Sequence, residues 1–114
     1  MVIRQGDVFW AELRPAEGSE PGFRRPVVVV QRDAINQSRF NTVLVVPLTS
    51  QTHHSHLPGN VVLHKDEANI PRPSLARATH VTVVDKTRLT ERIGTLSKER
   101  LQEIVDAMCW VIGR

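Results

Sequence analysis

Short apolar runs separated by turn-forming residues make up most of the chain, up to about residue 96. The runs at 27–31 and 42–48 are rich in Val and Leu without alternation, which is typical of strands buried on both faces. The predicted strands are residues 8–13, 27–31, 42–48, 60–63, 74–84 and 92–95, with short helical turns within 33–40 and 85–89. Pro47 lacks the N–H of a ladder bond, so we expect the second buried strand to end there at a sheet edge or a bulge.

The end of the chain has the period of a helix instead. Its apolar side chains recur at three- and four-residue spacings, at Leu101, Ile104, Val105, Met108, Val111 and Ile112. Ser97 is a suitable N-cap, and Gly113 suits the end of the helix. Short strands followed by one terminal helix predict a mainly β fold, a small, strongly bent sheet or barrel with a helix across one end.

The size and composition of the chain limit the class of protein. Its 114 residues predict a single domain over 1–114. Cys109 is the one cysteine, so an intrachain disulfide is excluded, and its apolar neighbours predict a buried thiol. No apolar run is long enough to span a membrane, and no secretory signal precedes the first predicted strand. We therefore expect a cytoplasmic protein with no membrane partner.

The charge balance alone leaves two interpretations open. Lys and Arg number 15 against 12 Asp and Glu, a net charge of +3, and only Lys65, Lys86 and Lys98 are lysines. Arg is favoured where bidentate contact with phosphate or carboxylate matters. An ordinary solvated surface of mixed charge explains the same composition equally well.

Arg24 and Arg25 stand between a long loop and a buried strand. The loop, residues 14–25, contains two Pro and two Gly, and a loop this long in a small domain is usually functional. Pro26 favours an extended conformation at Arg25, which would present its guanidinium at the mouth of the strand. This placement suits phosphate binding. The alternative is that one arginine is merely solvated and the other pairs with Glu20.

Thr49 and Ser50 follow the other buried strand. Hydroxyl groups there can donate to a phosphate oxygen or cap a turn, and turn capping is the simpler role. Consecutive strands often pair. Antiparallel pairing of 27–31 with 43–48 would bring Arg25 close to Thr49 at one rim of the sheet, which would favour the phosphate.

The run His53-His54-Ser55-His56 raises the question of a metal site. Structural zinc sites need four ligands at defined spacings, and no second Cys/His cluster supplies them. The simplest interpretation is an exposed histidine loop, followed by a loop that contacts RNA, with a metal site as the last alternative. We expect neither a metal nor an organic cofactor.

Taken in order, several segments resemble the MazF/PemK family of toxin endoribonucleases. They are RQGDVFW (4–10), GSEPGFRRPVVV (18–29), NTVLVVPLTS (41–50), LPGNV (57–61), VDKTRL (84–89) and RIGTLS (92–97). The resemblance implies an SH3-like small barrel of the CcdB/PemK-like toxin fold, usually a homodimer. It also implies metal-independent cleavage of single-stranded RNA, in which the 2′-hydroxyl attacks the adjacent phosphate and leaves 2′,3′-cyclic phosphate and 5′-hydroxyl ends.

The resemblance also implies roles for particular residues. Arg25 would stabilise the charge that develops on the phosphate, and Thr49 would bind and orient that phosphate. Glu20 is the candidate for a general base or a ribose contact, with a loop salt bridge as its alternative. The full set of expected RNA-binding residues is Ser19, Glu20, Arg24, Ser50, His54 and His80.

One departure and two alternatives bear on this expectation. Where relatives often have Ser-Gln, this chain has Thr79-His80, so the cleavage motif cannot be transferred. For an RNase toxin we expect a small acidic antitoxin that folds across the basic groove. The alternatives are a non-enzymatic toxin of similar fold that inhibits DNA gyrase through its C-terminal helix, and an RNA-binding module with a degenerate site. The first alternative needs neither Arg25 nor Thr49, and the presence of both argues against the second.

Overall fold

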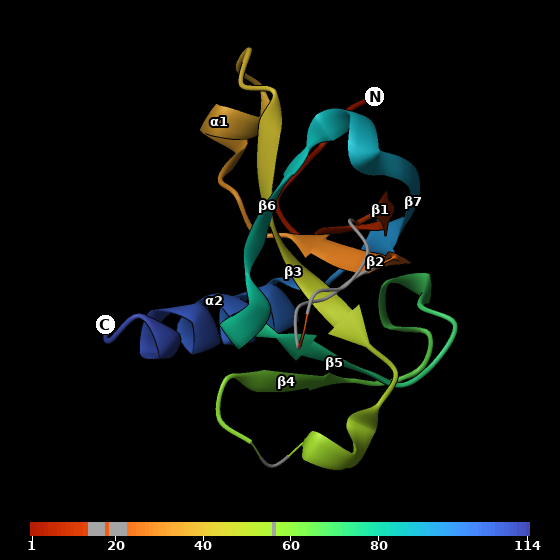
Figure 1. Cartoon of the computed structure of the whole chain (residues 1–114), viewed down its shortest axis with the longest axis vertical. Coiled ribbons are helices and arrows are strands. Elements are labelled where there is room, and N and C mark those ends of the chain that lie inside the picture. The colour runs from red at the N-terminus through yellow and green to blue at the C-terminus, as the bar shows by residue number, and fades with distance from the viewer. Residues whose placement is uncertain (14–17, 19–22, 56) are drawn as a thin grey trace.

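The strand β3 (Thr42–Thr49) forms the centre of a seven-stranded antiparallel sheet (Figure 1). The computed structural model describes residues 1–13, 18, 23–55 and 57–114. One side of β3 pairs with β2 (Arg24–Val29), which pairs in turn with β1 (Asp7–Glu12) and then β7 (Leu89–Thr95). The other side pairs with β6 (Thr82–Asp85) near the start of β3 and with β5 (Ser74–Arg77) near its end, and β5 pairs with β4 (Asn60–Leu63).

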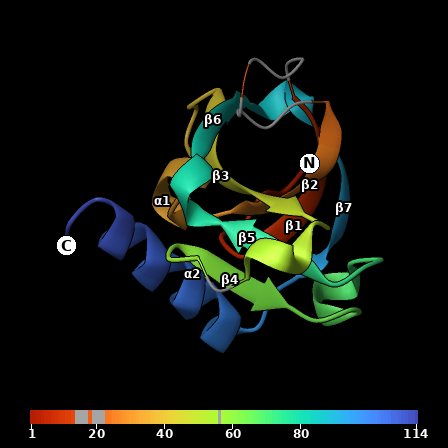
Figure 2. The ribbon, with the colours of Figure 1, turned by 60° about the horizontal axis from the view of Figure 1, so that its bottom comes forward.

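The alternation of side chains along β1, β2 and β3 creates two apolar cores, one on each face. The first core lies on the side of the terminal helix, α2 (Lys98–Val111). Its buried residues are Val8, Val28, Val30, Val46, Leu48, Val61, Leu63, Ile70, Ala76, Leu96 and Ile104. The second core is enclosed where β6, β3, β2, β1 and β7 curve around (Figure 2). It consists of Ile3, Phe9, Ala11, Val27, Val29, Val43, Val45, Val84 and Leu89.

The terminal helix forms as its apolar spacing predicts. The Ser97 hydroxyl accepts a hydrogen bond from the backbone N–H of Arg100 at 3.2 Å, which caps the first turn. Ile104 is fully buried in the first core, and the helix packs against β4 and the short η3 turn (Ala78–His80). Gly113 follows the helix with a φ of 83°, so the predicted end is also confirmed.

Two predictions about strands are wrong. Residues 74–84 are not one strand, because the 3₁₀ turn η3 separates β5 from β6. The N–H of Val81 bonds to the carbonyl of Ala78, so the backbone tightens and the chain moves from the end of β3 to its start. Pro47 does not mark an edge or an end, because β3 continues through it to Thr49 between two partners. On one side Pro47 pairs with Val27 of β2. On the other side the partner of β3 changes from β6 to β5 at this point, so Pro47 pairs with neither of these two strands.

The short connecting elements fall close to where they are expected. The turn predicted within 33–40 is α1 (Asp33–Asn36), and that within 85–89 is η4 (Lys86–Arg88). The turns η1 (Thr52–His54) and η2 (Glu67–Asn69) come without a sequence prediction. Among the described residues, none of the helices combines the length and the apolar character needed to cross a bilayer.

Candidate active site

The register between β2 and β3 places Arg25 level with Thr49. Val27 pairs with Pro47, Val28 with Val46 and Val29 with Val45, which confirms the antiparallel pairing expected from the sequence. Continued two residues further, the same register brings Arg25 opposite Thr49. Residues that face each other across an antiparallel pair project from the same face of the sheet. Arg25 and Thr49 therefore share the face that carries the second core.

The Arg25 guanidinium stands on a partly buried part of this face. Arg25 pairs with Ala11 of β1, which is fully buried, and is itself half-buried. Burial lowers the pKa of the Arg25 guanidinium, and the positive charge of Arg77 lowers it further. Arginine keeps its proton at physiological pH even so. The site thus holds a permanent cation with reduced hydration next to a second one.

Thr49 brings a hydroxyl group to the same place. It pairs with Leu75 of β5 and is half-buried. Its Oγ1 accepts a hydrogen bond from the backbone N–H of Gln51 at 3.2 Å, so the turn-capping role considered from the sequence is confirmed. A hydroxyl has one proton to donate as well as two acceptor positions. Capping therefore fixes the hydroxyl and still leaves its proton for another acceptor.

Arg77 joins these residues, although the sequence did not identify it as a site residue. It is the last residue of β5, two positions beyond Leu75, and it pairs with Asn60 of β4. By alternation its side chain projects from the same face as Leu75 and Thr49. Its Nε is the one side-chain nitrogen or oxygen, in the described part of the chain, that is buried without a hydrogen-bond partner. If the sequence had indicated that the strand ends at residue 77, rather than at residue 84, the place of Arg77 beside Thr49 could have been predicted.

Arg24 lies on the opposite face from Arg25. Its guanidinium carbon is 4.2 Å from the centre of the Trp10 ring, and its Nε is 3.7 Å from Oε1 of Glu12. A cation over an aromatic face and an exposed ion pair explain this arrangement without a ligand. The structure therefore does not bring Arg24 to Arg25 and Thr49.

The other predicted site residues are placed to different extents. Ser50 is exposed directly after β3. His80 is half-buried in η3, with Nδ1 3.0 Å from the hydroxyl of Thr79. Ser19 and Glu20 lie outside the described residues, and for His54 the structure describes the backbone of η1 but not the side chain.

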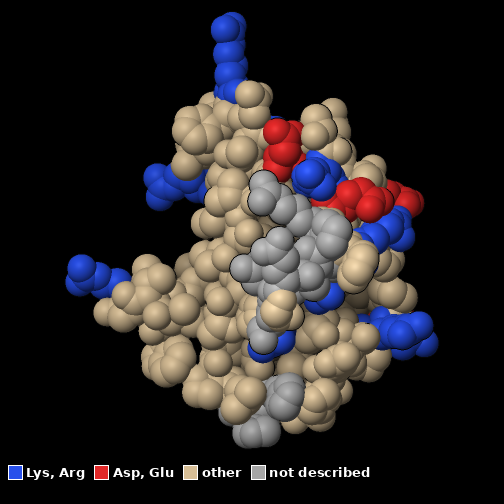
Figure 3. Space-filling model, in the orientation of Figure 1, with Lys and Arg blue, Asp and Glu red and all other residues tan. Residues whose placement is uncertain are grey.

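Basic side chains mark the part of the surface near the end of β3. In Figure 3, Lys and Arg appear in both halves of the view, whereas the Asp and Glu of this view lie in its upper half, so the charged side chains seen in the lower half, where Figure 1 shows β4, β5 and the end of β3, are basic. This arrangement favours an anionic ligand over a cationic one.

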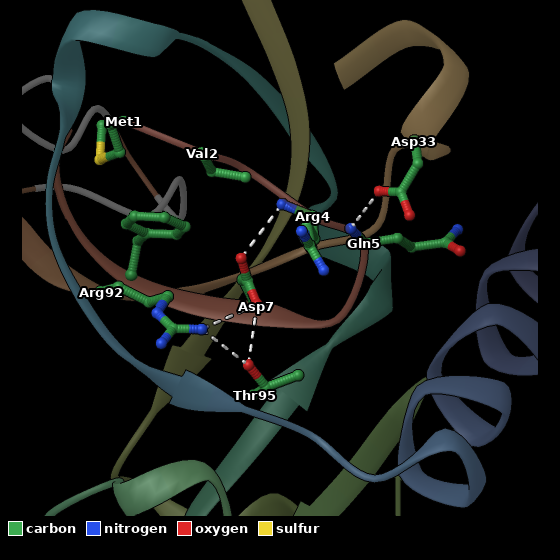
Figure 4. A pocket seen from close by; sticks show the side chains of 9 residues that line it. Met1, Val2, Arg4, Gln5, Asp7, Asp33, Arg92 and Thr95 are labelled. Atoms are coloured by element: carbon green, nitrogen blue, oxygen red, sulfur yellow. Dashed lines mark hydrogen bonds and ion pairs between the residues drawn. The ribbon is translucent and has the colours of Figure 1, made fainter. Parts of the chain in front are cut away.

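A separate cavity of about 600 Å³ lies at the start of β1 (Figure 4). One of the residues that line it is the buried Asp7. Its Oδ2 accepts a hydrogen bond from the N–H of Arg4 at 3.0 Å, and its Oδ1 accepts one from the Thr95 hydroxyl at 2.8 Å. Arg92 adds an ion pair to Asp7 at 3.7 Å. These contacts tie the N-terminal segment to the end of β7 and satisfy the carboxylate. Because Arg25 pairs at the other end of β1, this cavity is not part of the candidate active site.

Comparison with known proteins agrees with this description. Residues 4–112 match the model of a family described as the PemK-like, MazF-like toxin of type II toxin–antitoxin system. The chain is 39% identical over 104 residues to endoribonuclease MazF2 of Mycobacterium bovis and to endoribonuclease MazF6 of Mycobacterium tuberculosis, with 91% of each chain covered.

Solved structures show the same fold. A crystal structure of MazF from Deinococcus radiodurans superposes with a TM-score of 0.82 at 23% identity, covering 100% of this chain and 99% of that one. An endoribonuclease in complex with its cognate antitoxin, from a mycobacterial species, gives a TM-score of 0.78 at 18% identity, covering 97% and 95%. The predicted fold, mainly β with a terminal helix and like that of MazF, is confirmed. With a family match over nearly its whole length, the chain belongs to the PemK-like and MazF-like toxins of type II toxin–antitoxin systems.

Proposed function

We propose that the protein is an endoribonuclease toxin that cleaves single-stranded RNA. The observation that carries the proposal is the register of β2 and β3, which, continued two residues beyond the pair of Val27 and Pro47, brings Arg25 and Thr49 level on one face of the sheet. A cation and a hydroxyl side by side suit the oxygens of a phosphodiester. The mycobacterial relatives, which are named endoribonucleases, support the reaction class.

The proposed reaction is an intramolecular transesterification. The 2′-oxygen of the RNA attacks the adjacent phosphorus, so a new O2′–P bond forms while the P–O5′ bond breaks. The 2′-hydroxyl loses its proton and the departing 5′-oxygen gains one. The products are a 2′,3′-cyclic phosphate and a 5′-hydroxyl end, and the chemistry requires no metal ion.

Arg25 stabilises the negative charge that builds up on the phosphate in the transition state. A guanidinium that is already partly desolvated by the protein loses less hydration when the phosphate arrives, so its field acts strongly there. Its high pKa makes charge stabilisation a better role for Arg25 than proton donation to the leaving oxygen.

Thr49 orients the phosphate by donating its hydroxyl proton to a non-bridging oxygen. The hydrogen bond that Oγ1 accepts from Gln51 N–H fixes the direction of this donor. Preorganised donors of this kind lower the barrier because they need no rearrangement during the reaction.

The remaining expected residues are proposed for RNA contacts around this centre. Ser50 follows Thr49 on the exposed rim, and His80 is the last residue of η3, the turn that follows Arg77. We keep Glu20 as the candidate general base, with Ser19 and His54 as candidate RNA contacts. Arg24 belongs to the other face of β2, and we leave it outside the site.

The proposed partners follow from the same family assignment. Solved relatives include an endoribonuclease bound to its cognate antitoxin, which supports an antitoxin partner for this chain, and we propose that this partner is small and acidic. Trp110 is 61% exposed on α2 and Ile112 is 71% exposed just after it, which supports a homodimer that covers apolar surface near this helix. The single domain would act in the cytoplasm, where single-stranded mRNA is found.

Mapping both ends of RNA cleaved by the wild-type protein in EDTA tests this proposal. We expect cuts at a short recurring motif, with 2′,3′-cyclic phosphate on one side and 5′-hydroxyl on the other. Loss of cleavage on chelation would contradict the metal-free reaction. Intact RNA together with inhibition of DNA gyrase would replace the proposal by that of a non-enzymatic toxin.

A further inference from the structure

Three neighbouring strands contribute polar side chains to one patch of the sheet. β3 contributes Thr49 in the middle, β2 contributes Arg25 on one side, and β5 contributes Arg77 on the other. Adjacent strands are ~4.8 Å apart, and Arg77 is two residues along β5 from Leu75, the partner of Thr49, so the backbones that carry the two arginines are separated by about 12 Å across β3. Arginine side chains are long enough to converge over such a gap. A group bound above Thr49 would lie within reach of both guanidiniums.

Arg77 brings a second positive charge to this patch. Arg77 forms no ion pair with a described carboxylate, and its charge acts unfavourably on Arg25. Two cations that act on one another in a partly buried place are unfavourable unless an anion lies near both. This electrostatic arrangement fits an anionic ligand.

The buried Nε of Arg77 points to the same conclusion independently. A buried donor without an acceptor is costly, and such groups in folded proteins usually have a functional explanation. The edge of a guanidinium that carries Nε offers two parallel N–H groups, which match two oxygens of a phosphate. A bound phosphate would supply the missing acceptor.

We propose that Arg77 is a second phosphate-binding arginine, which contacts the RNA backbone together with Arg25 and Thr49. The inference rests on the proposed function, because the phosphate is that of the RNA substrate. It adds a binding residue from β5 to a site that sequence motifs place on β2 and β3 alone. The RNA backbone would then cross the end of β3, held from both sides.

The salt dependence of binding separates this role from a structural one. The probe is an RNA that carries a 2′-deoxy sugar at the mapped cleavage position, which prevents the reaction. For Arg77→Gln we expect about 10-fold weaker binding at low salt. We also expect a slope of log K against log salt that is smaller by about 0.7, since one phosphate contact with a single strand is lost. Arg77→Lys keeps the charge and should retain the slope while binding more weakly than wild type.

Arg39→Gln is the matched control, because it removes one exposed positive charge before the start of β3, at the far end of that strand from Thr49. It should leave the slope unchanged. A slope for folded Arg77→Gln equal to that of wild type would overturn the inference, even if RNA cleavage by the wild type is confirmed.

A measurement on the wild-type protein does not depend on activity or on a variant that folds. Titration with inorganic phosphate, followed by NMR at the Arg77 Nε–H, should shift this resonance in a saturable manner. The absence of a saturable shift would count against the Arg77 site itself. Failure of wild-type protein to cut any RNA, with the shift present, would instead reject the nuclease and retain an anion site.

Discussion

Val27 of β2 lies directly opposite Pro47 of β3, and this single pair fixes the position of the candidate site. Because the side-chain period of a strand is two, Arg25 and Thr49 project from the same face as this pair. A slip of one residue would turn one of them to the other face. The same register buries Val27 and Val29 in the second core, so apolar packing of the sheet holds the polar residues in position.

Replacement of Arg25 by Gln should abolish most of the cleavage activity. We expect kcat to fall by about 10²–10³-fold, the usual loss when one charge-stabilising group is removed from an active site. Because the interaction strengthens in the transition state, kcat should fall more than KM rises. Single-turnover kinetics on a short RNA that contains the mapped motif would measure both.

Arg24→Gln is the matched control for this variant, because it removes the same charge one residue away. Its side chain lies over Trp10 on the opposite face, so most of the activity should remain. Circular dichroism would establish that both variants fold. Equal losses in the two variants would show that general positive charge matters rather than the face of the sheet.

Thr49→Val should remove both roles of the hydroxyl group, one of which is measured by activity and the other by stability. The variant keeps the shape of the side chain but loses both the donor to the phosphate and the cap on Gln51 N–H. We expect activity to fall by about 10²-fold and stability to fall by about 1 kcal/mol. Thr49→Ser retains the hydroxyl and should keep activity within several-fold of wild type. Rates for Ser as low as those for Val would contradict a direct contact between the hydroxyl and the RNA.

The sequence predicts the central part of the site because two long apolar runs follow one another. Consecutive buried strands tend to pair with each other, and Arg25 and Thr49 adjoin the two paired runs in the sequence, so the pairing brings them close together. The separation of Arg24 from Arg25 was not predicted, because β2 begins at Arg24 rather than at Val27. Once both arginines belong to a strand, alternation must send them to opposite faces.

The position of Arg77 could not be predicted from local pattern. Residues 74–84 alternate small and larger side chains without a clear break, yet β3 needs two different partners along its length. The chain moves from one end of β3 to the other through η3, and no Gly or Pro at 78–80 signals this turn. The tertiary structure therefore ends the strand predicted over 74–84 at Arg77, the residue that lies beside Arg25 and Thr49.

Gly94 of β7 tests a different part of the structure, the contact between the sheet and η2. A Cβ at residue 94 would overlap the carbonyl group of Ala68. Ala68 is itself held at a φ of 50° between Asp66 and Asn69, whose φ values are also positive, so the turn has little freedom to move away. Because the obstacle is backbone rather than a flexible side chain, Gly94→Ala should lower the free energy of unfolding by about 2–3 kcal/mol.

Gly113→Ala provides the contrast, because a Cβ there meets nothing within 4 Å although φ is 83°. Its cost should be only about 1 kcal/mol, from the left-handed backbone alone. Urea unfolding of both variants, compared at equal m-values, would measure the difference. Similar small losses would mean that η2 can shift away from β7 at little cost. The larger loss at Gly94 would instead show that close backbone packing holds this turn against the edge of the sheet.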